Sequence, residues 1–231
     1  QGYGLTETSP VISVNRENCN NPVTVGQPIP GLQIRLGDIE ELQVKGPTVM
    51  KGYWKRPDAT AEVFTEDGWF RTGDQADLSD AGRIRIKGRI KEIIVTSTGE
   101  KIPPTDMELA IQTDPLFEQV MVVGEARPFI TALAVVNEAE WEKFAKEFNV
   151  DPSDDRMLMR RDIRMAALKR LKKAASRFPQ YGIPRNIRLL KEHWTVDNGC
   201  LTVTMKLRRP IIREKLRAEI DELYTVPQNN V

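Results

Sequence analysis

The stretch that decides the fold is residues 82–89, which read Gly-Arg-Ile-Arg-Ile-Lys-Gly-Arg. Its two isoleucines alternate with charged residues, which predicts a strand with one buried face after a turn at 80–82. Upstream of this stretch the sequence is rich in short strands and turns, whereas helices and strands are mixed downstream. We therefore expect an α+β protein with two domains, residues 1–87 and residues 88–231, and a boundary segment at 88–92.

The upstream domain is predicted to be a small β-barrel or β-rich subdomain. Short apolar runs at 11–14, 32–36 and 42–45 are separated by Gly, Pro and Asn, at the spacing typical of a small barrel or sandwich. No helix of ordinary length is expected before about residue 104.

The downstream domain is predicted to combine helices with strands. Thr105 and Glu108 match a capping box, which predicts a helix over 106–112. The later elements are expected in this order: strands at 120–123 and 130–136, a helix capped by Asn137, a helix over about 155–177, a hairpin turn at 197–199 and a last helix beginning at Pro210.

The composition is that of a globular protein, and it narrows the possible partners. The 231 residues carry 34 Lys and Arg against 33 Asp and Glu, so no overall charge favours nucleic acid as a partner. The longest apolar run, 130–136, is far shorter than the ~20 residues that cross a bilayer. Two cysteines, Cys19 and Cys200, are ordinary for a reducing compartment, so we expect a cytoplasmic protein. A single histidine, His193, excludes a histidine-rich metal site and is expected at the surface.

The helix predicted over 155–177 departs from this balance of charge. Its polar face carries basic residues, namely Arg160, Arg161, Arg164, Lys169, Arg170, Lys172, Lys173 and Arg177. Such a face is typical of a solvated helix surface, and also of a patch that binds an anionic ligand or a membrane surface. The sequence leaves both interpretations open. If the second is right, the protein makes a peripheral contact with the inner face of the membrane.

Three segments far apart in the sequence carry residue types suited to one nucleotide site. The first offers an aromatic face, an approachable backbone, a hydroxyl and a carboxylate, at Tyr3, Gly4, Thr6 and Glu7. The second ends in Asp74 behind a glycine, and the third places Arg89 at the predicted boundary. Each segment alone is a weak indication, because a Gly-Asp pair usually marks only a turn.

Together and in this order, the segments resemble the signatures of the adenylate-forming superfamily, which includes acyl-CoA synthetases. The resemblance extends through Val-Gly-Gln-Pro-Ile-Pro-Gly at 25–31, Lys-Gly-Pro at 45–47, Gly-Tyr-Trp at 52–54, Asp-Gly-Trp-Phe-Arg-Thr-Gly-Asp at 67–74 and Ser-Thr-Gly-Glu-Lys-Ile at 97–102. The pattern Leu-Thr-Val-Thr-Met-Lys at 201–206 looks like that of the bacterial long-chain fatty acid CoA ligases.

The resemblance implies a reaction in two steps. The carboxylate of a fatty acid attacks the α-phosphorus of ATP to give an acyl adenylate and pyrophosphate, and the thiol of CoA then takes the acyl group. It implies that Tyr3 stacks on adenine beside Gly4, and that Thr6 donates to the α-phosphate or the acyl carboxylate. It also implies that Asp74 accepts the ribose hydroxyls and that Arg89 adds donors nearby.

Four further residues receive roles from the same resemblance. Glu7 matches the residue that holds Mg²⁺, and Gly99 matches the glycine beside the tunnel for the pantetheine arm of CoA. Lys206 matches the lysine that serves the adenylation step, and Lys91 matches the hinge about which the downstream domain rotates between the two steps. The resemblance thus implies a β-rich subdomain followed by a mobile α+β domain.

The chain resembles only the last part of such enzymes. Their Ser/Thr/Gly-rich phosphate loop does not occur in these 231 residues, and the sequence does not begin with Met, so we expect a piece of a longer protein that is inactive alone. An aryl- or medium-chain acyl-CoA ligase is the alternative within the same class. A non-catalytic module that binds a nucleotide, CoA or a membrane surface is the alternative from another class.

Overall fold

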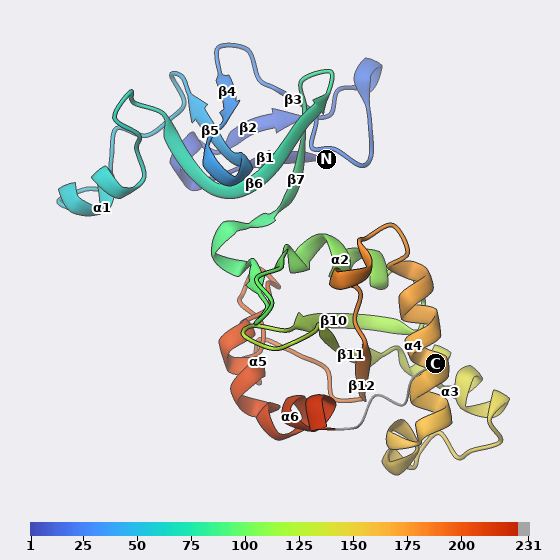
Figure 1. Ribbon diagram of the computed structural model, residues 1–231. Helices are drawn as coiled ribbons and strands as arrows, with labels where there is room; N and C mark the ends of the chain where they lie inside the picture. Colours follow the sequence, from blue (N-terminus) through green and yellow to red (C-terminus); the bar gives the residue numbers. More distant parts are fainter. Residues whose placement is uncertain (226–231) are drawn as a thin grey trace. The chain divides into compact units, whose positions relative to one another are not determined.

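The computed structural model describes residues 1–225 of the chain (Figure 1). The contacts divide the chain into two units, unit 1 from Gln1 to Ile93 and unit 2 from Ile94 to Val231. The predicted α+β class is confirmed, because unit 1 is rich in strands and unit 2 combines a sheet with helices. We describe each unit by itself.

Unit 1 contains two antiparallel sheets. One has the order β1-β2-β3 and the other the order β4-β5-β6-β7. The bounds are β1 Gly2–Gly4, β2 Val11–Val14, β3 Gln27–Pro28, β4 Gln33–Leu36, β5 Glu41–Lys45, β6 Phe70–Asp80 and β7 Arg83–Arg89, and the short helix α1 spans Pro57–Glu62. The strands expected at 11–14, 32–36, 42–45 and 82–87 are therefore confirmed.

The core of unit 1 lies between these sheets. Ile84, the first isoleucine of the alternating stretch, is fully buried there with Ile12 and Leu42, while the charged neighbours of Ile84 are more exposed. The Val25 N–H donates to the Ile84 carbonyl at 2.8 Å, and the Ile84 N–H donates to the Gly26 carbonyl at 2.9 Å. The 82–89 stretch thus joins the two sheets of unit 1.

Unit 2 is built on a sheet of order β10-β11-β12. β11 pairs antiparallel with β10 and parallel with β12. The bounds are β8 Ile94–Val95, β9 Lys101–Ile102, α2 Pro104–Ile111, β10 Phe117–Val123, β11 Thr131–Val136, α3 Glu138–Glu147, α4 Arg161–Ala174, β12 Asn186–Leu190, α5 Arg209–Lys215 and α6 Arg217–Thr225. Short 3₁₀ turns occur at Thr6–Thr8, Glu17–Cys19, Asp38–Glu40, Ile90–Glu92, Asp155–Met159 and Gln180–Gly182.

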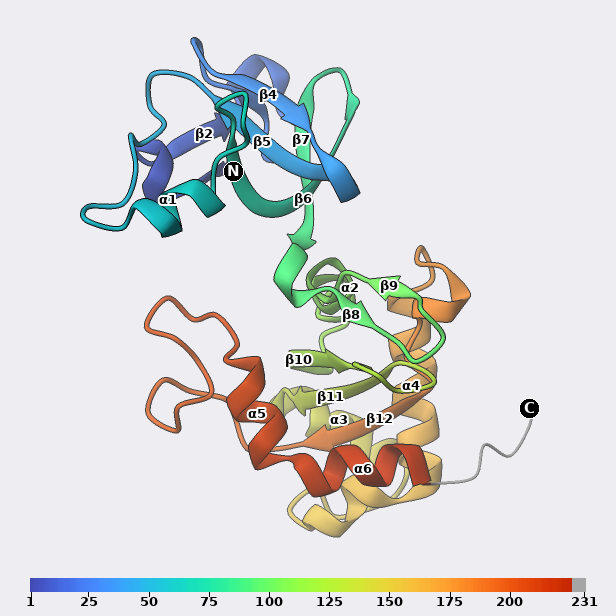
Figure 2. The same ribbon diagram turned by 60° about the vertical axis from the view of Figure 1, so that its left-hand side comes forward.

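Both faces of the sheet in unit 2 are covered, which explains why the central strand β11 is buried at every position. Val120 and Val122 face a cluster that includes residues of α2, α3 and α4, whereas Met121 and Val123 face a second cluster that includes α5 and α6. Figure 2 shows α5 and α6 on the one face and α2 and α4 on the other. Asn137 caps α3 as predicted, since its side chain accepts a hydrogen bond from the Glu140 N–H.

The predicted capping box at Thr105 and Glu108 is wrong. The cap residue of α2 is Pro103, and no side chain caps it. The Glu108 carboxylate is instead buried, where it pairs with Arg209 and accepts a hydrogen bond from the Val122 N–H. A largely buried arginine that makes two parallel hydrogen bonds is a stronger partner for a carboxylate than the end of its own helix.

The long helix predicted over 155–177 is interrupted. A 3₁₀ turn at Asp155–Met159 ends at Arg160, whose backbone is extended at φ −61° and ψ 130°, and α4 begins at the next residue. The last helix is likewise two helices, because Leu216 at φ −108° and ψ 30° separates α5 from α6. Both interruptions are changes of direction that the hydrophobic pattern does not reveal.

The basic face of α4 is partly neutralised by neighbours. Arg170 pairs with Asp114 at 2.6 Å and Arg160 pairs with Asp162 at 2.5 Å, while Arg164 donates to the Asn186 side chain. These contacts reduce the positive charge that the face presents, and both interpretations of it stay open. Within residues 1–225, no helix is both long enough and apolar enough to span a membrane.

Candidate functional site

Three of the predicted site residues meet in unit 1. Asp74 on β6 lies opposite Arg89 on β7, and the Arg89 Nε lies 2.9 Å from the Asp74 Oδ1. The Tyr3 hydroxyl on β1 donates to the Asp74 Oδ2 at 2.5 Å, although the two residues are 71 positions apart in the sequence. The Asp74 side chain is only 6% exposed, so these partners hold an ionised carboxylate in a largely buried position.

The turn before Asp74 is held by a buried carboxylate that the sequence analysis did not single out. Glu41 accepts from the Arg71 Nε at 2.9 Å and from the Gly73 N–H at 3.2 Å. The Thr72 hydroxyl accepts from the Asp74 N–H at 3.1 Å and donates to the Leu42 carbonyl. Nothing in the spacing identifies Glu41, because its partners lie about thirty residues further along the chain.

Burial raises the pKa of the Tyr3 hydroxyl well above its usual range. The negative charge of Asp74 and the hydrogen bond to it act in the same direction, while Arg89 opposes them. The Tyr3 hydroxyl therefore keeps its proton near neutral pH and donates it to Asp74, which helps to fix the orientation of the carboxylate.

The packing of the strands requires glycine at position 4, in addition to its predicted role beside a ligand. The pairing of β1 with β2 is irregular between Tyr3 and Gly4, and a Cβ at Gly4 would lie 1.7 Å from the Pro10 carbonyl oxygen. Only glycine allows this approach of the two strands.

Glu7 lies in the 3₁₀ turn at Thr6–Thr8, where the Tyr53 hydroxyl donates to its Oε1 at 2.8 Å. This hydrogen bond, with burial and the charge of Glu7, raises the pKa of Tyr53. Within residues 1–225, no three acidic, Cys or His side chains gather in a way that could hold a metal ion. A single carboxylate fits Mg²⁺ that is shared with substrate phosphates, and it does not fit a cage made of protein ligands alone.

Three of the remaining candidates are Thr6, Lys91 and Gly99. Thr6 is exposed beside Glu7. Lys91 is exposed in the 3₁₀ turn Ile90–Glu92, close to the division between the units. Gly99 in unit 2 has φ +84° in the connection between β8 and β9, with open space where a Cβ would point.

Lys206 lies in a loop of unit 2. The loop is closed by a bridge between Leu201 and Leu207 and by the Thr202 N–H, which donates to the Lys206 carbonyl at 2.9 Å. The Lys206 side chain is exposed. A turn is present at 197–199, with Gly199 at φ 75°, but no pair of strands flanks it among residues 1–225, so the predicted hairpin is wrong.

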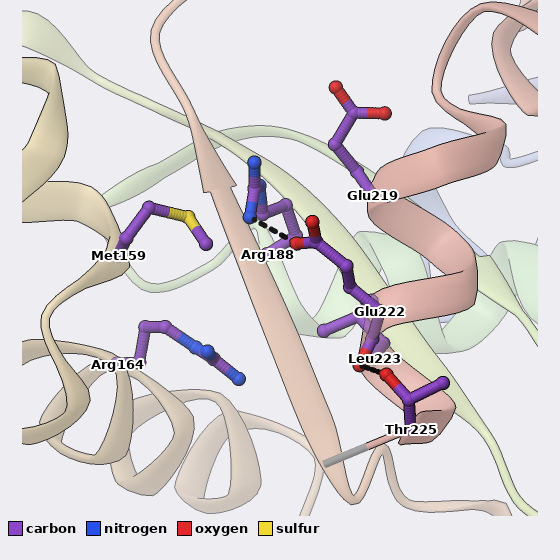
Figure 3. A pocket seen from close by; sticks show the side chains of 7 residues that line it. All are labelled: Met159, Arg164, Arg188, Glu219, Glu222, Leu223 and Thr225. Carbon is purple, nitrogen blue, oxygen red and sulfur yellow. Dashed lines mark hydrogen bonds and ion pairs between the residues drawn. The ribbon is translucent and has the colours of Figure 1, made fainter.

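A small pocket in unit 2 contains none of the predicted site residues. Its volume is about 190 Å³, and it lies between α4, β12 and α6 (Figure 3). Arg188 pairs with Glu222 there at 3.1 Å. Burial lowers the pKa of Arg164, and repulsion from Arg188 adds to this effect while Glu222 opposes it. The pocket is completed by Met159, Glu219, Leu223 and Thr225.

Matches to known families show the class of protein. Residues 1–54 match the AMP-binding enzyme family, and residues 91–227 match the C-terminal domain of AMP-binding enzymes. The second match covers more than half of the chain, so the chain belongs to the AMP-binding enzymes, the adenylate-forming superfamily that includes the acyl-CoA synthetases.

Within this family the chain is similar to fatty acid CoA ligases. It is 37% identical to the long-chain-fatty-acid–CoA ligase FadD15 of Mycobacterium bovis over 97% of its own length and 38% of that protein. It is 34% identical to the long-chain-fatty-acid–CoA ligase 1 of Cavia porcellus over 97% of the chain and 34% of that protein. The chain therefore spans little more than a third of the length of these relatives.

The fold is shared with solved adenylation domains. The adenylation domain of the carboxylate reductase of Mycobacterium chelonae superposes with a TM-score of 0.76 at 26% identity, over 97% of the chain and 34% of that domain. The recognition of an adenylate-forming, acyl-CoA synthetase-like sequence from its motifs is thus confirmed.

Proposed function

We propose that this chain supplies the C-terminal part of an ATP-dependent long-chain fatty acid CoA ligase, which forms an acyl adenylate and then transfers the acyl group to CoA. The observation that carries the proposal is the convergence of Tyr3, Asp74 and Arg89 from three distant segments of a chain that is similar to such ligases over 97% of its length.

The cluster suits a ribose and its base. A carboxylate offers about four lone-pair sites, so Asp74 can accept hydroxyls of a ribose in addition to the bonds from Tyr3 and Arg89. The Arg89 guanidinium is a planar fork of donors paired with Asp74, and it holds the carboxylate in place beside the nucleotide. The ring of Tyr3 supplies the aromatic face for adenine.

The adenylation step needs positive charge where the carboxylate meets the α-phosphorus. Lys206 provides an exposed ammonium for this position, and Thr6 provides a hydroxyl donor. Mg²⁺, when it is bound through Glu7 and the phosphates, offsets part of the phosphate charge. These roles follow from the motifs that the residues match.

The thioester step needs a second arrangement of the units. We place the hinge at Lys91, in the turn between β7 and β8, and the pantetheine arm of CoA beside Gly99. The open space next to Gly99 agrees with a passage for a narrow chain. The proposal includes a cytoplasmic location with peripheral membrane contact for substrate uptake.

The test uses an enzyme in which this chain follows the upstream region of the Mycobacterium bovis ligase, called here the joined enzyme. We expect it to form a CoA thioester from palmitate, with ATP consumed to AMP and pyrophosphate. Preference for benzoate or octanoate over palmitate would favour the aryl- or medium-chain alternative. Binding of ATP or CoA without any turnover would favour the non-catalytic module.

A further inference from the structure

The tip of the loop that carries Lys206 is exposed, and the hydrogen bonds described below do not link it to the rest of the unit. Val203 and Met205 are 87% and 68% exposed, and Met205 takes a left-handed backbone at φ 61°. The hydrogen bonds of the tip run within the loop, from the Thr202 N–H to the Lys206 carbonyl and from the Lys206 N–H to the Thr202 hydroxyl. The direction in which the ammonium points therefore depends on the base of the loop.

The base of the loop is anchored by a buried ion pair. Arg209 begins α5 directly after the loop, and its Nη1 and Nη2 lie 2.7 Å and 2.6 Å from the Oε1 and Oε2 of Glu108. The exposed fractions of the two side chains are 16% for Arg209 and 7% for Glu108. Two parallel bonds between a guanidinium and a carboxylate fix the angle between the groups as well as their distance.

Glu108 is itself held from a third element. Its Oε1 also accepts from the Val122 N–H of β10 at 2.7 Å. One carboxylate therefore ties the start of α5 to α2 and to an edge of the central sheet. On the other side of the loop, Leu201 is buried in the cluster under α5 and α6, and the Arg208 N–H donates to the Cys200 carbonyl at 2.8 Å.

We propose that Glu108 and Arg209 are positioning residues for Lys206: the pair holds the base of the 201–208 loop so that the ammonium is presented in one direction. The inference rests on the proposed function, since it concerns the lysine of the adenylation step. A buried pair adds little net stability compared with apolar side chains of equal size. The role we assign to this pair is therefore to orient the loop that carries Lys206. Lysine at position 209 keeps the charge and loses the fork.

The unit offers a matched control in another bidentate pair. The Arg170 Nε and Nη2 lie 2.9 Å and 2.6 Å from the two carboxylate oxygens of Asp114, on α4 rather than beside the loop. Arg170→Lys therefore makes the same chemical change as Arg209→Lys, at a place where no effect on Lys206 is expected.

The first measurement uses the 231-residue chain itself. Hydrogen exchange of the Thr202, Lys206 and Arg208 amides is followed in Arg209→Lys, Glu108→Gln and Arg170→Lys. We expect the first two variants to speed exchange in the loop by about tenfold or more, as local opening is favoured. Arg170→Lys should leave loop exchange within about twofold of the unchanged chain. Equal effects of all three variants would overturn the proposal.

The second measurement uses the joined enzyme and separates the two half-reactions. A loss of direction near the reacting atoms can reduce a rate by up to about a hundredfold. Arg209→Lys should therefore slow adenylation by at least about tenfold, and change thioester formation from a supplied acyl adenylate by less than about threefold. Equal slowing of both steps, or none, would overturn the positioning role.

Lys206→Ala distinguishes failure of this inference from failure of the proposed function. If Lys206→Ala slows adenylation and the Glu108 and Arg209 variants do not, Lys206 acts without the pair and the inference is wrong. If Lys206→Ala leaves adenylation unchanged, the proposed function of the loop is wrong and the inference falls with it.

Discussion

Asp74 and Arg89 face each other across β6 and β7, with the Arg89 Nε 2.9 Å from the Asp74 Oδ1. Arg89 is the last residue of β7, so the carboxylate is placed by the pairing of two long strands of unit 1. A site built on paired strands keeps its geometry better than one built on a loop.

Asp74→Asn in the joined enzyme should weaken nucleotide binding. The amide removes the charge from the hydrogen bonds to ribose and to Arg89, a loss of roughly 1.5–3 kcal/mol. This corresponds to an increase of about 10- to 150-fold in the Kd for AMP. Calorimetry measures the Kd. The control is Asp67→Asn, which removes the exposed partner of Arg35 in the same unit. A Kd within about twofold of the unchanged enzyme would contradict the role of Asp74.

Tyr3→Phe should change how the stability of the chain depends on alkaline pH. The pKa of Tyr3 is raised in the folded state, so its contribution is fully present below the unfolded pKa, about 10, and is lost as pH rises above it. Above pH ~10, the free energy of unfolding of the unchanged chain should therefore fall more steeply with pH than that of Tyr3→Phe. The difference between the two slopes should be up to about 1.4 kcal/mol per pH unit.

Urea unfolding at pH 9 and at pH 11 measures this difference. Tyr181→Phe, at a half-exposed position of unit 2, is the control and should follow the unchanged chain. If Tyr3→Phe also has the same dependence on pH as the unchanged chain, Tyr3 does not hold its proton through Asp74.

Local periodicity predicted most of the fold, because it depends only on neighbours in the sequence. The alternation at 82–87 and the cap at Asn137 are examples of such signals. Glu108 shows where this reasoning fails. The motif predicted that its carboxylate caps its own helix, but the carboxylate binds Arg209, which is 101 residues away in the sequence. The breaks at Arg160 and Leu216 were missed because the hydrophobic stripe continues through them.

The candidate site was predictable in its members but not in its contacts. Tyr3, Asp74 and Arg89 were found through segments that resemble a family, and no spacing rule places the Tyr3 hydroxyl on Asp74. The supporting carboxylate of Glu41 and the contact of Tyr53 with Glu7 depend on the folded sheets, and only the structure identifies them.

The 231-residue chain alone should have no ligase activity. The donors that hold the β- and γ-phosphates belong to a loop that does not occur in its sequence, so the triphosphate would lose most of its electrostatic stabilisation. Exchange of pyrophosphate into ATP in the presence of palmitate measures this step. Palmitate-dependent exchange by the chain alone would show that these donors are not needed.

Lys91→Pro in the joined enzyme should slow one half-reaction far more than the other. Proline fixes φ near about −65° and removes the N–H, so the turn at 90–92 can no longer absorb the dihedral change of a rotation. Lys91→Ala, which leaves the backbone free to rotate, is the control and should retain both steps. Equal losses in both steps for Lys91→Pro would mean that the hinge lies elsewhere.

The measurement that tests the account most directly is the effect of Lys206→Ala on the two half-reactions of the joined enzyme. If the ammonium stabilises the adenylation transition state, the rate of palmitate-dependent pyrophosphate exchange should fall by roughly 10²–10³. Thioester formation from a supplied acyl adenylate should stay nearly unchanged, because that step uses the other arrangement of the units. An adenylation rate within about threefold of the unchanged enzyme would contradict the catalytic role of Lys206 and the assignment of the 201–209 loop.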